Sequence, residues 1–236
     1  MKTQSFFQLA FLALLTTMSL FQAEAQAPQA PFESFAVKGR NGWMINQRLH
    51  FGPFETGKVK RGWVKGYNVP LILEFSGAKE KLQFELFENG QPMATTFCLG
   101  KLTRKDLPVL NKLFYLQLDT DDVFSGAVVD AQNRHYEFLV TGLHAYARPN
   151  AAEGFIQGQG KHIEMRPLRE LESGKKFPIS FPIGIEFVLD GQVIGAVETL
   201  NEGRIRFDAH LDPDLKAVIN SVACALLLRS ELDRQE

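Results

Sequence analysis

The chain has 236 residues and carries 26 Lys and Arg against 27 Asp and Glu, so its formal net charge at pH 7 is −1. Because nucleic-acid binding relies on an excess of positive charge, this balance argues against it, and we expect no nucleic-acid partner. Hydrophobic residues make up 45% of the chain and charged residues 22%, which argues against a disordered chain and suffices for one buried core.

The N-terminus has the pattern of a cleavable secretory signal peptide, predicted over residues 1–27. Lys2 precedes an apolar stretch over residues 6–21, and small side chains follow at the spacing that signal peptidase accepts, at Ala23, Ala25 and Ala27. Polar residues interrupt the stretch, which falls short of the roughly 20 apolar residues that span a bilayer. The sequence therefore predicts an exported protein, periplasmic or secreted, without a retained transmembrane helix.

A short tether at residues 28–31 is predicted next, followed by a single β domain over residues 32–236 in which apolar and polar residues alternate. The clearest strands, 81–88 and 91–98, flank Asn89 and Gly90, a pair that favours the type I′ turn of a hairpin. Asp190 and Gly191 predict a second such hairpin between strands 183–189 and 192–199. The remaining predicted strands are 32–38, 43–51, 56–64, 69–75, 113–118, 123–129, 136–141, 155–157, 162–165 and 204–210. About a dozen short strands favour a barrel or a sandwich.

The last predicted element is a helix over residues 213–231. Asp212 stands where a side chain caps the first turn, and Pro213 presets the backbone of the first helical residue. Residues 215–228 are apolar on nearly every side, but the unbroken apolar run over 222–228 is too short to cross a membrane. A helix that is apolar all round is buried all round. We therefore expect an all-β fold, a closed or nearly closed antiparallel barrel of about twelve strands, with this hydrophobic C-terminal helix inside it.

This arrangement resembles the tubby-like barrel superfamily, which includes tubby C-terminal domains, phospholipid scramblases and LURP-one-related proteins. The likeness is carried by residues 190–195, by the strand that ends at His210, by the helix entrance at 211–217 and by 35–38, which is similar to the family's opening strand. The resemblance implies a twelve-stranded barrel threaded by a hydrophobic helix. It implies a fold and no activity, because the cysteine-rich and calcium-binding segments of scramblases and the basic lipid-binding positions of tubby domains have no counterpart that we can match here.

Two cysteines, Cys98 and Cys224, exclude a framework of disulfides. We expect both to be buried free thiols, with a bridge between barrel wall and helix as the alternative. No motif predicts a catalytic residue, a metal site or a cofactor: the acidic turn at 119–122 lacks the ligand pattern of a calcium loop, the histidines are scattered, and no serine stands in a nucleophile motif.

A basic run is the one candidate binding site. Cations and aromatic residues alternate there, and their charge suits an anionic headgroup or glycan, although a solvated strand face has the same pattern. The candidate binding residues are Lys58, Lys60, Arg61, Trp63 and Lys65. We expect a non-enzymatic envelope protein that binds a lipid, a membrane surface or a protein partner through the outside of a filled barrel. The alternative is a cell-envelope hydrolase with a site built from loops.

Overall fold

The computed structural model describes residues 31–40, 47–62, 80–102, 123–141, 153–170 and 182–229. The chain divides into two units, Met1–Pro31 and Phe32–Glu236, and every described residue except Pro31 belongs to the second. Several predictions lie outside the described residues: the signal peptide, most of the tether, strands 69–75 and 113–118, the first four residues of strand 43–51, the last two helical residues, and the candidate binding residues Trp63 and Lys65.

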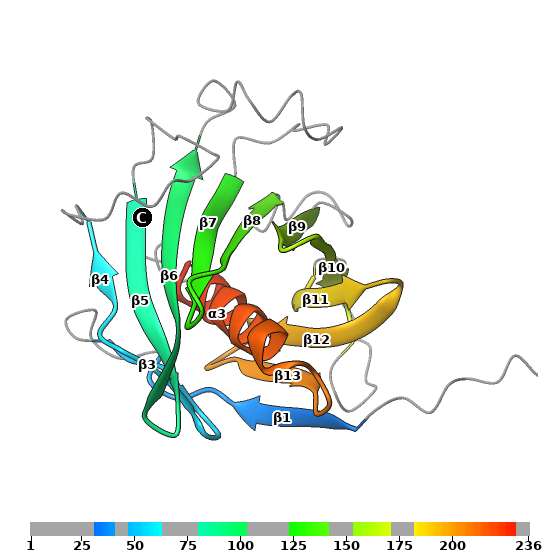
Figure 1. Cartoon of the computed structure of the whole chain (residues 1–236), viewed down its shortest axis with the longest axis horizontal. Helices are drawn as coiled ribbons and strands as arrows, with labels where there is room; N and C mark the ends of the chain where they lie inside the picture. The colour runs from blue at the N-terminus through cyan, green and yellow to red at the C-terminus, as the bar shows by residue number, and fades with distance from the viewer. Residues whose placement is uncertain are drawn as a thin grey trace, which may run out of the picture. The chain divides into compact units, whose positions relative to one another are not determined.

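The described strands form one antiparallel sheet that curls into a barrel (Figure 1). Along the sheet the order is β1-β13-β12-β11-β10-β9-β8-β7-β6-β5-β3-β2, and β4 pairs with β5 beside that path. Their bounds are β1 Phe32–Ala36, β2 His50–Phe51, β3 Phe54–Thr56, β4 Lys60–Arg61, β5 Glu80–Glu88, β6 Gln91–Leu102, β7 Val123–Asp130, β8 His135–Thr141, β9 Glu153–Gly158, β10 Lys161–Leu168, β11 Gly184–Leu189, β12 Gln192–Glu198 and β13 Arg204–Asp208. Twelve strands thus follow the ring, as the sequence predicted.

The two ends of this sheet meet just beyond β1. Lys38 and His50 form an antiparallel bridge, in which the amide of each donates to the carbonyl of the other at 2.9 and 3.0 Å. We call the line along which the first and last strands of the sheet meet the seam. Next to the bridge, aromatic side chains fill the seam: the ring centre of Phe35 lies 6.3 Å from that of Phe54 and 5.9 Å from that of Phe207. Hydrophobic packing therefore completes a ring that backbone pairing leaves nearly closed.

Local sequence and structure agree at the hairpin turns. Asn89 and Gly90 both have positive φ, of 51° and 79°, and Asp190 and Gly191 have the same two values, as a type I′ turn requires. The sequence did not predict a third such turn at Gln159, with a φ of 51°, and Gly160, with a φ of 72°. Because glutamine is not a typical turn residue, that hairpin had no clear local signal.

The predicted strand 56–64 is wrong as one element. Thr56 and Val59 are both buried, which a strict alternation does not allow, and the pairing with β5 breaks between β3 and β4. The break lies after Gly57: its amide still donates to the carbonyl of Glu85 at 2.8 Å in the register of β3, whereas the amide of Val59 donates to the carbonyl of Gln47 at 3.0 Å. β4 then pairs with β5 one residue out of the register of β3.

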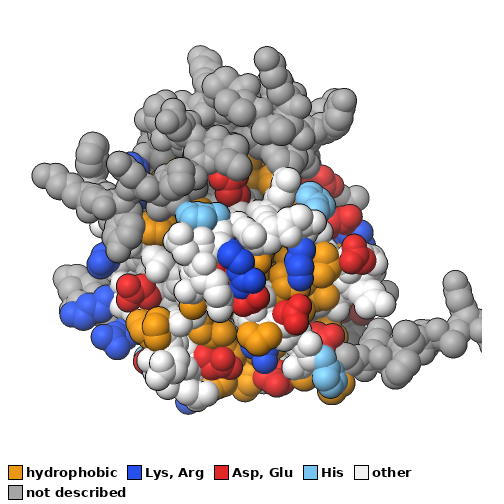
Figure 2. Space-filling model, viewed as in Figure 1, with side chains coloured by type: hydrophobic (Ala, Val, Ile, Leu, Met, Phe, Trp, Pro, Cys, Tyr) orange, Lys and Arg blue, Asp and Glu red, His pale blue; other side chains and the backbone are white. Residues whose placement is uncertain are grey.

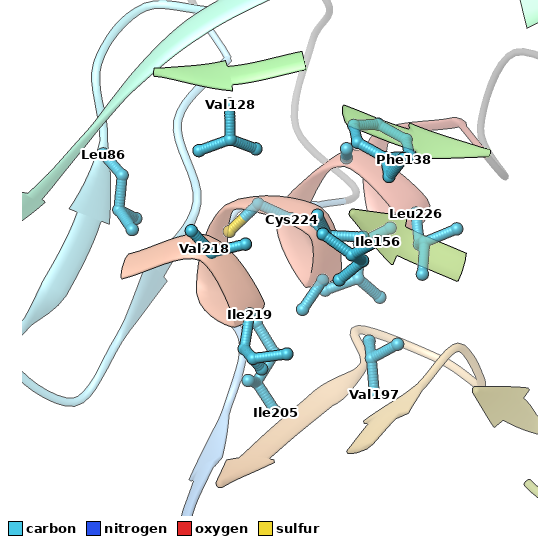
Figure 3. Close-up of a cluster of buried hydrophobic side chains, with 14 of the residues drawn as sticks. Leu86, Val128, Phe138, Ile156, Val197, Ile205, Val218, Ile219, Cys224 and Leu226 are labelled. Carbon is cyan, nitrogen blue, oxygen red and sulfur yellow. The ribbon is translucent and has the colours of Figure 1, made fainter. Parts of the chain in front are cut away.

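The C-terminal helix α3, Pro213–Arg229, lies inside the barrel (Figure 1). Every residue from Leu215 to Arg229 except Lys216 is buried. Figure 3 shows Ile219 beside Ile205 of β13, and Leu226 beside Ile156 and Phe138 of β9 and β8. The helix therefore supplies the centre of the core, and the prediction of a buried helix in a barrel is confirmed.

Ion pairs hold the N-terminal end of α3 to the short turns of the barrel. Arg134, in the turn between β7 and β8, pairs with Asp130 at 2.7 Å and also with Asp214 in the first turn of the helix. Lys161 of β10 lies 3.8 Å from Asp212. These acids near the helix N-terminus also suit the helix dipole. The same end carries the hairpin turns, and we call it the turn end of the barrel.

Candidate functional site

The candidate binding residues Lys58 and Lys60 are exposed, and two further cations lie close to them on neighbouring segments of the wall. These are Lys38, just beyond β1, and Arg48, just before β2, and both side chains are exposed. We call Lys38, Arg48, Lys58 and Lys60 the basic face. In Figure 2, Lys and Arg side chains gather at the left edge of the view, where Figure 1 shows β4.

Backbone hydrogen bonds bring the three segments of the basic face together. On one side, the segment that contains Arg48 is joined to Lys38 through the bridge at His50. On its other side, the amide of Thr56 donates to Leu49 at 2.9 Å and that of Val59 to Gln47 at 3.0 Å. Arg48 therefore lies between Lys38 and Lys58. Lys38 and Arg48 gave no signal in the sequence as part of a site, because only the closure of the barrel brings them beside Lys58.

The cations of this face are not engaged in ion pairs. Within the described part of the chain, no ion pair involves any of its four cations. The adjoining strands carry glutamates, Glu33 on β1, Glu55 on β3 and Glu80, Glu85 and Glu88 on β5, and Glu55 is 3.3 Å from His50.

The third candidate residue, Arg61, does not share this face. It is paired in register with Leu82, which belongs to the core inside the barrel, whereas Lys60 is paired with Gln83 on the other face of β5. The Nη2 group of Arg61 donates to Oε1 of Gln47 at 2.7 Å. The alternation of side chains along β4 therefore separates Arg61 from Lys60, and Arg61 belongs to a structural network.

That network ties the seam of the barrel to the turn between β12 and β13. Nε2 of Gln47 donates to the carbonyl of Arg40 at 2.8 Å, and Nη1 of Arg40 donates to the carbonyls of Thr199 and Asn201 at 2.7 and 2.8 Å. Arg40 has no exposed surface. A buried guanidinium held by two carbonyls is a strong, charge-assisted attachment. We call Arg40, Gln47 and Arg61 the seam network.

The seam network lies at the end of the barrel opposite the turn end. In the meander from β5 to β12, connections alternate between the two ends, so the segments over residues 103–122, 142–152 and 171–181 all join strand ends here. The helix also ends here, because Arg229 lies over the ring of Phe124, 4.9 Å from its centre. We call this the loop end. A site built from those connections, as the hydrolase alternative requires, falls outside the described residues.

The two cysteines are structural in this fold. Both are free and fully buried, and burial raises the pKa of each thiol well above its usual range. Because the thiolate is the reactive form, neither group is poised as a nucleophile. The expected free thiols are present, and the alternative of a bridge between wall and helix is not.

Among the residues that the structure covers, no serine is hydrogen-bonded to a histidine, and no cluster of three His, Cys, Asp or Glu could hold a metal ion. In the same residues, no helix combines the length and the apolar character needed to cross a membrane. No family model, curated protein or solved structure matches the chain.

Proposed function

We propose that this chain is an exported, non-enzymatic binding module that docks onto an anionic surface, the headgroups of an envelope membrane, through its basic face. The supporting observation is the set of four exposed cations that have no ion pair in the described residues, gathered on three adjacent segments. Lysine and arginine near an anionic bilayer contribute about 1 kcal/mol each to binding. Such a face suits a charged surface better than a compact ligand, because it lies on the outside of the barrel wall.

The filled interior also supports a role for the outer surface. Barrels that carry small apolar ligands keep a central cavity, whereas α3 occupies the centre here with residues such as Val222 and Ala223 that have no exposed surface. A barrel with a C-terminal helix inside it is the feature by which this chain resembles the tubby-like superfamily. The resemblance is part of this proposal at the level of the fold alone.

Docking through the basic face predicts a selective loss of vesicle binding when its charges are removed. The variant Lys58→Gln with Lys60→Gln is expected to bind vesicles containing phosphatidylglycerol about 10- to 30-fold more weakly than the parent chain, as two charges worth about 1 kcal/mol each imply. Raising the salt concentration should weaken the parent in the same way, because exposed charges are screened. Vesicle co-sedimentation measures both effects, with phosphatidylcholine vesicles as the neutral surface.

The matched control is Arg166→Gln with Arg169→Gln, which removes two exposed cations in and just after β10 and changes the net charge by the same amount. This control is expected to bind like the parent. An equal loss in both variants would show that net charge and not the basic face governs binding. A parent chain that does not bind anionic vesicles overturns the membrane as ligand and leaves a protein partner as the occupant of this face.

Export is the other part of the proposal, and it rests on the N-terminal sequence. We expect the protein isolated from its natural source to begin at Gln26 or Pro28, after removal of the signal peptide. Intact-mass measurement with N-terminal sequencing checks this. A chain that retains its first 25 residues would contradict cleavage.

A further inference from the structure

Three polar side chains interrupt the apolar interior between α3 and the wall. Thr96 of β6 and Asn220 and Ser221 of α3 have no exposed surface. In the described structure, neither hydroxyl has a hydrogen-bond partner, and neither Oδ1 nor Nδ2 of Asn220 has one. Buried polar groups in folded proteins are nearly always satisfied, so four unpaired polar atoms in one core call for a physical explanation.

The orientation of α3 shows which wall Ser221 faces. On the opposite wall, a Cβ placed on Gly195 of β12 would lie 3.0 Å from Cγ2 of Ile219, and Lys216 lies over the ring of Phe207 of β13 at 5.2 Å. Successive residues of a helix are turned by about 100°, so Ser221 lies about 160° around the axis from Ile219. Ser221 therefore faces away from β12, toward the side of the barrel that contains β6.

The direction of α3 places Ser221 near the height of Thr96. The helix begins at the turn end and ends beside Phe124 at the loop end, so it runs in the same sense as β6. Cys224 lies near Cys98, since its thiol adds to the effect of burial in raising the pKa of Cys98. One helical turn before Cys224 is Ser221, and two strand residues before Cys98 is Thr96. Similar rises along the two elements bring the two hydroxyls to the same level.

Asn220 lies four residues before Cys224 and therefore on the same side of the helix as Cys224, so it adds both kinds of hydrogen-bonding atom to this region. Its carbonyl oxygen accepts, its amide group donates, and a hydroxyl does both. Water bound inside a protein needs two to four such partners, and ordered internal water commonly satisfies polar groups that the chain itself leaves unpaired. Ala217 lies four residues before Ser221 in the helix, and Ala94 lies two residues before Thr96 in β6, so both are nearer the turn end. Both are small and buried, so these two positions do not crowd the polar groups from that side.

From these observations we propose that the barrel interior contains a hydration site between α3 and β6, in which ordered water is bound by Asn220, Ser221 and Thr96. The ligand is water, because the site is enclosed and its surroundings are apolar. The bound water links the helix to the wall at a level where no direct hydrogen bond joins them in the described residues. This site is independent of the basic face, which lies on the outside of the barrel.

Two measurements test the hydration site on the full chain. A high-resolution crystal structure is expected to show water at roughly 2.7–3.2 Å from the side chain of Asn220. Magnetic relaxation dispersion of water is expected to detect long-lived internal water, and the signal should fall in Ser221→Ala and fall further in Asn220→Leu. The control Ile219→Val, which removes one methyl group from the opposite side of the helix, should leave the signal unchanged.

The outcomes separate a wet site from a dry one. An interior without water in the crystal, or an undiminished relaxation signal in both polar variants, overturns the proposal. If Asn220→Leu does not fold, Ser221→Ala and Thr96→Val decide, because both are close to their parents in volume. A fall of the signal in these two variants supports the site, and an unchanged signal overturns it.

Discussion

Replacing Arg40 by methionine is expected to lower the free energy of unfolding by about 3–5 kcal/mol. Arg40 is fully buried, and its guanidinium donates to the carbonyls of Thr199 and Asn201. Methionine has a comparable length but no donor, so both carbonyls lose a charge-assisted hydrogen bond in a region away from water. The loss is a large part of the stability of a typical domain, which is roughly 5–15 kcal/mol. Urea unfolding followed by fluorescence measures it.

Arg48→Met is the matched control, because Arg48 is exposed on the neighbouring segment and loses the same charge. A surface substitution of this kind changes the unfolding free energy by no more than about 0.5 kcal/mol. If the two variants lose the same stability, the seam network does not hold the barrel closed, and the backbone bridge between Lys38 and His50 and the packing of Phe35 must do so.

Shortening Leu226 to alanine is expected to cost about 2–5 kcal/mol of unfolding free energy. Leu226 is 2% exposed and lies beside Ile156 and Phe138 (Figure 3), so its removal leaves a cavity between helix and wall. Thermal and urea unfolding of the two proteins give the difference. The size of the effect depends on how far the surrounding strands can relax, and a ring of paired strands relaxes little.

Leu226→Met separates cavity formation from general disturbance of the helix, because methionine conserves the volume and is expected to cost less than about 1.5 kcal/mol. If the alanine variant is as stable as the methionine variant, Leu226 does not lie in a packed interior. That result would contradict a helix inside the barrel in solution.

The features that the sequence predicted correctly depend on local chemistry. Asn89 and Gly90 adopt positive φ because their own side chains permit it, and the alternation of 81–88 identifies the buried face of β5 without reference to its neighbours. The helix is the strongest case. A segment that is apolar all round has no face to offer to water, so its burial follows from composition.

The candidate binding site was predicted less well, because the strand that carries its residues is interrupted by contacts with other segments. Lys58 and Lys60 are exposed, as a strand face predicts, but the strand breaks after Gly57. At the break the amide of Val59 donates to the carbonyl of Gln47, a residue of the segment that leads into β2, and β4 pairs with β5 one residue out of the register of β3. As a result, Arg61 joins Gln47 in the seam, and its position could not be read from the run of basic residues.

By itself, the sequence determined the near-neutral charge of this protein and its fold class, many short strands with one helix that must be buried. It also predicts an export signal. Only the tertiary structure decided which cations share a surface, which arginines are buried, and which polar groups meet between helix and wall. The distinction is physical. Local conformation and burial depend on neighbouring side chains, whereas the basic face and the seam network depend on contacts between segments that the closure of the barrel brings together.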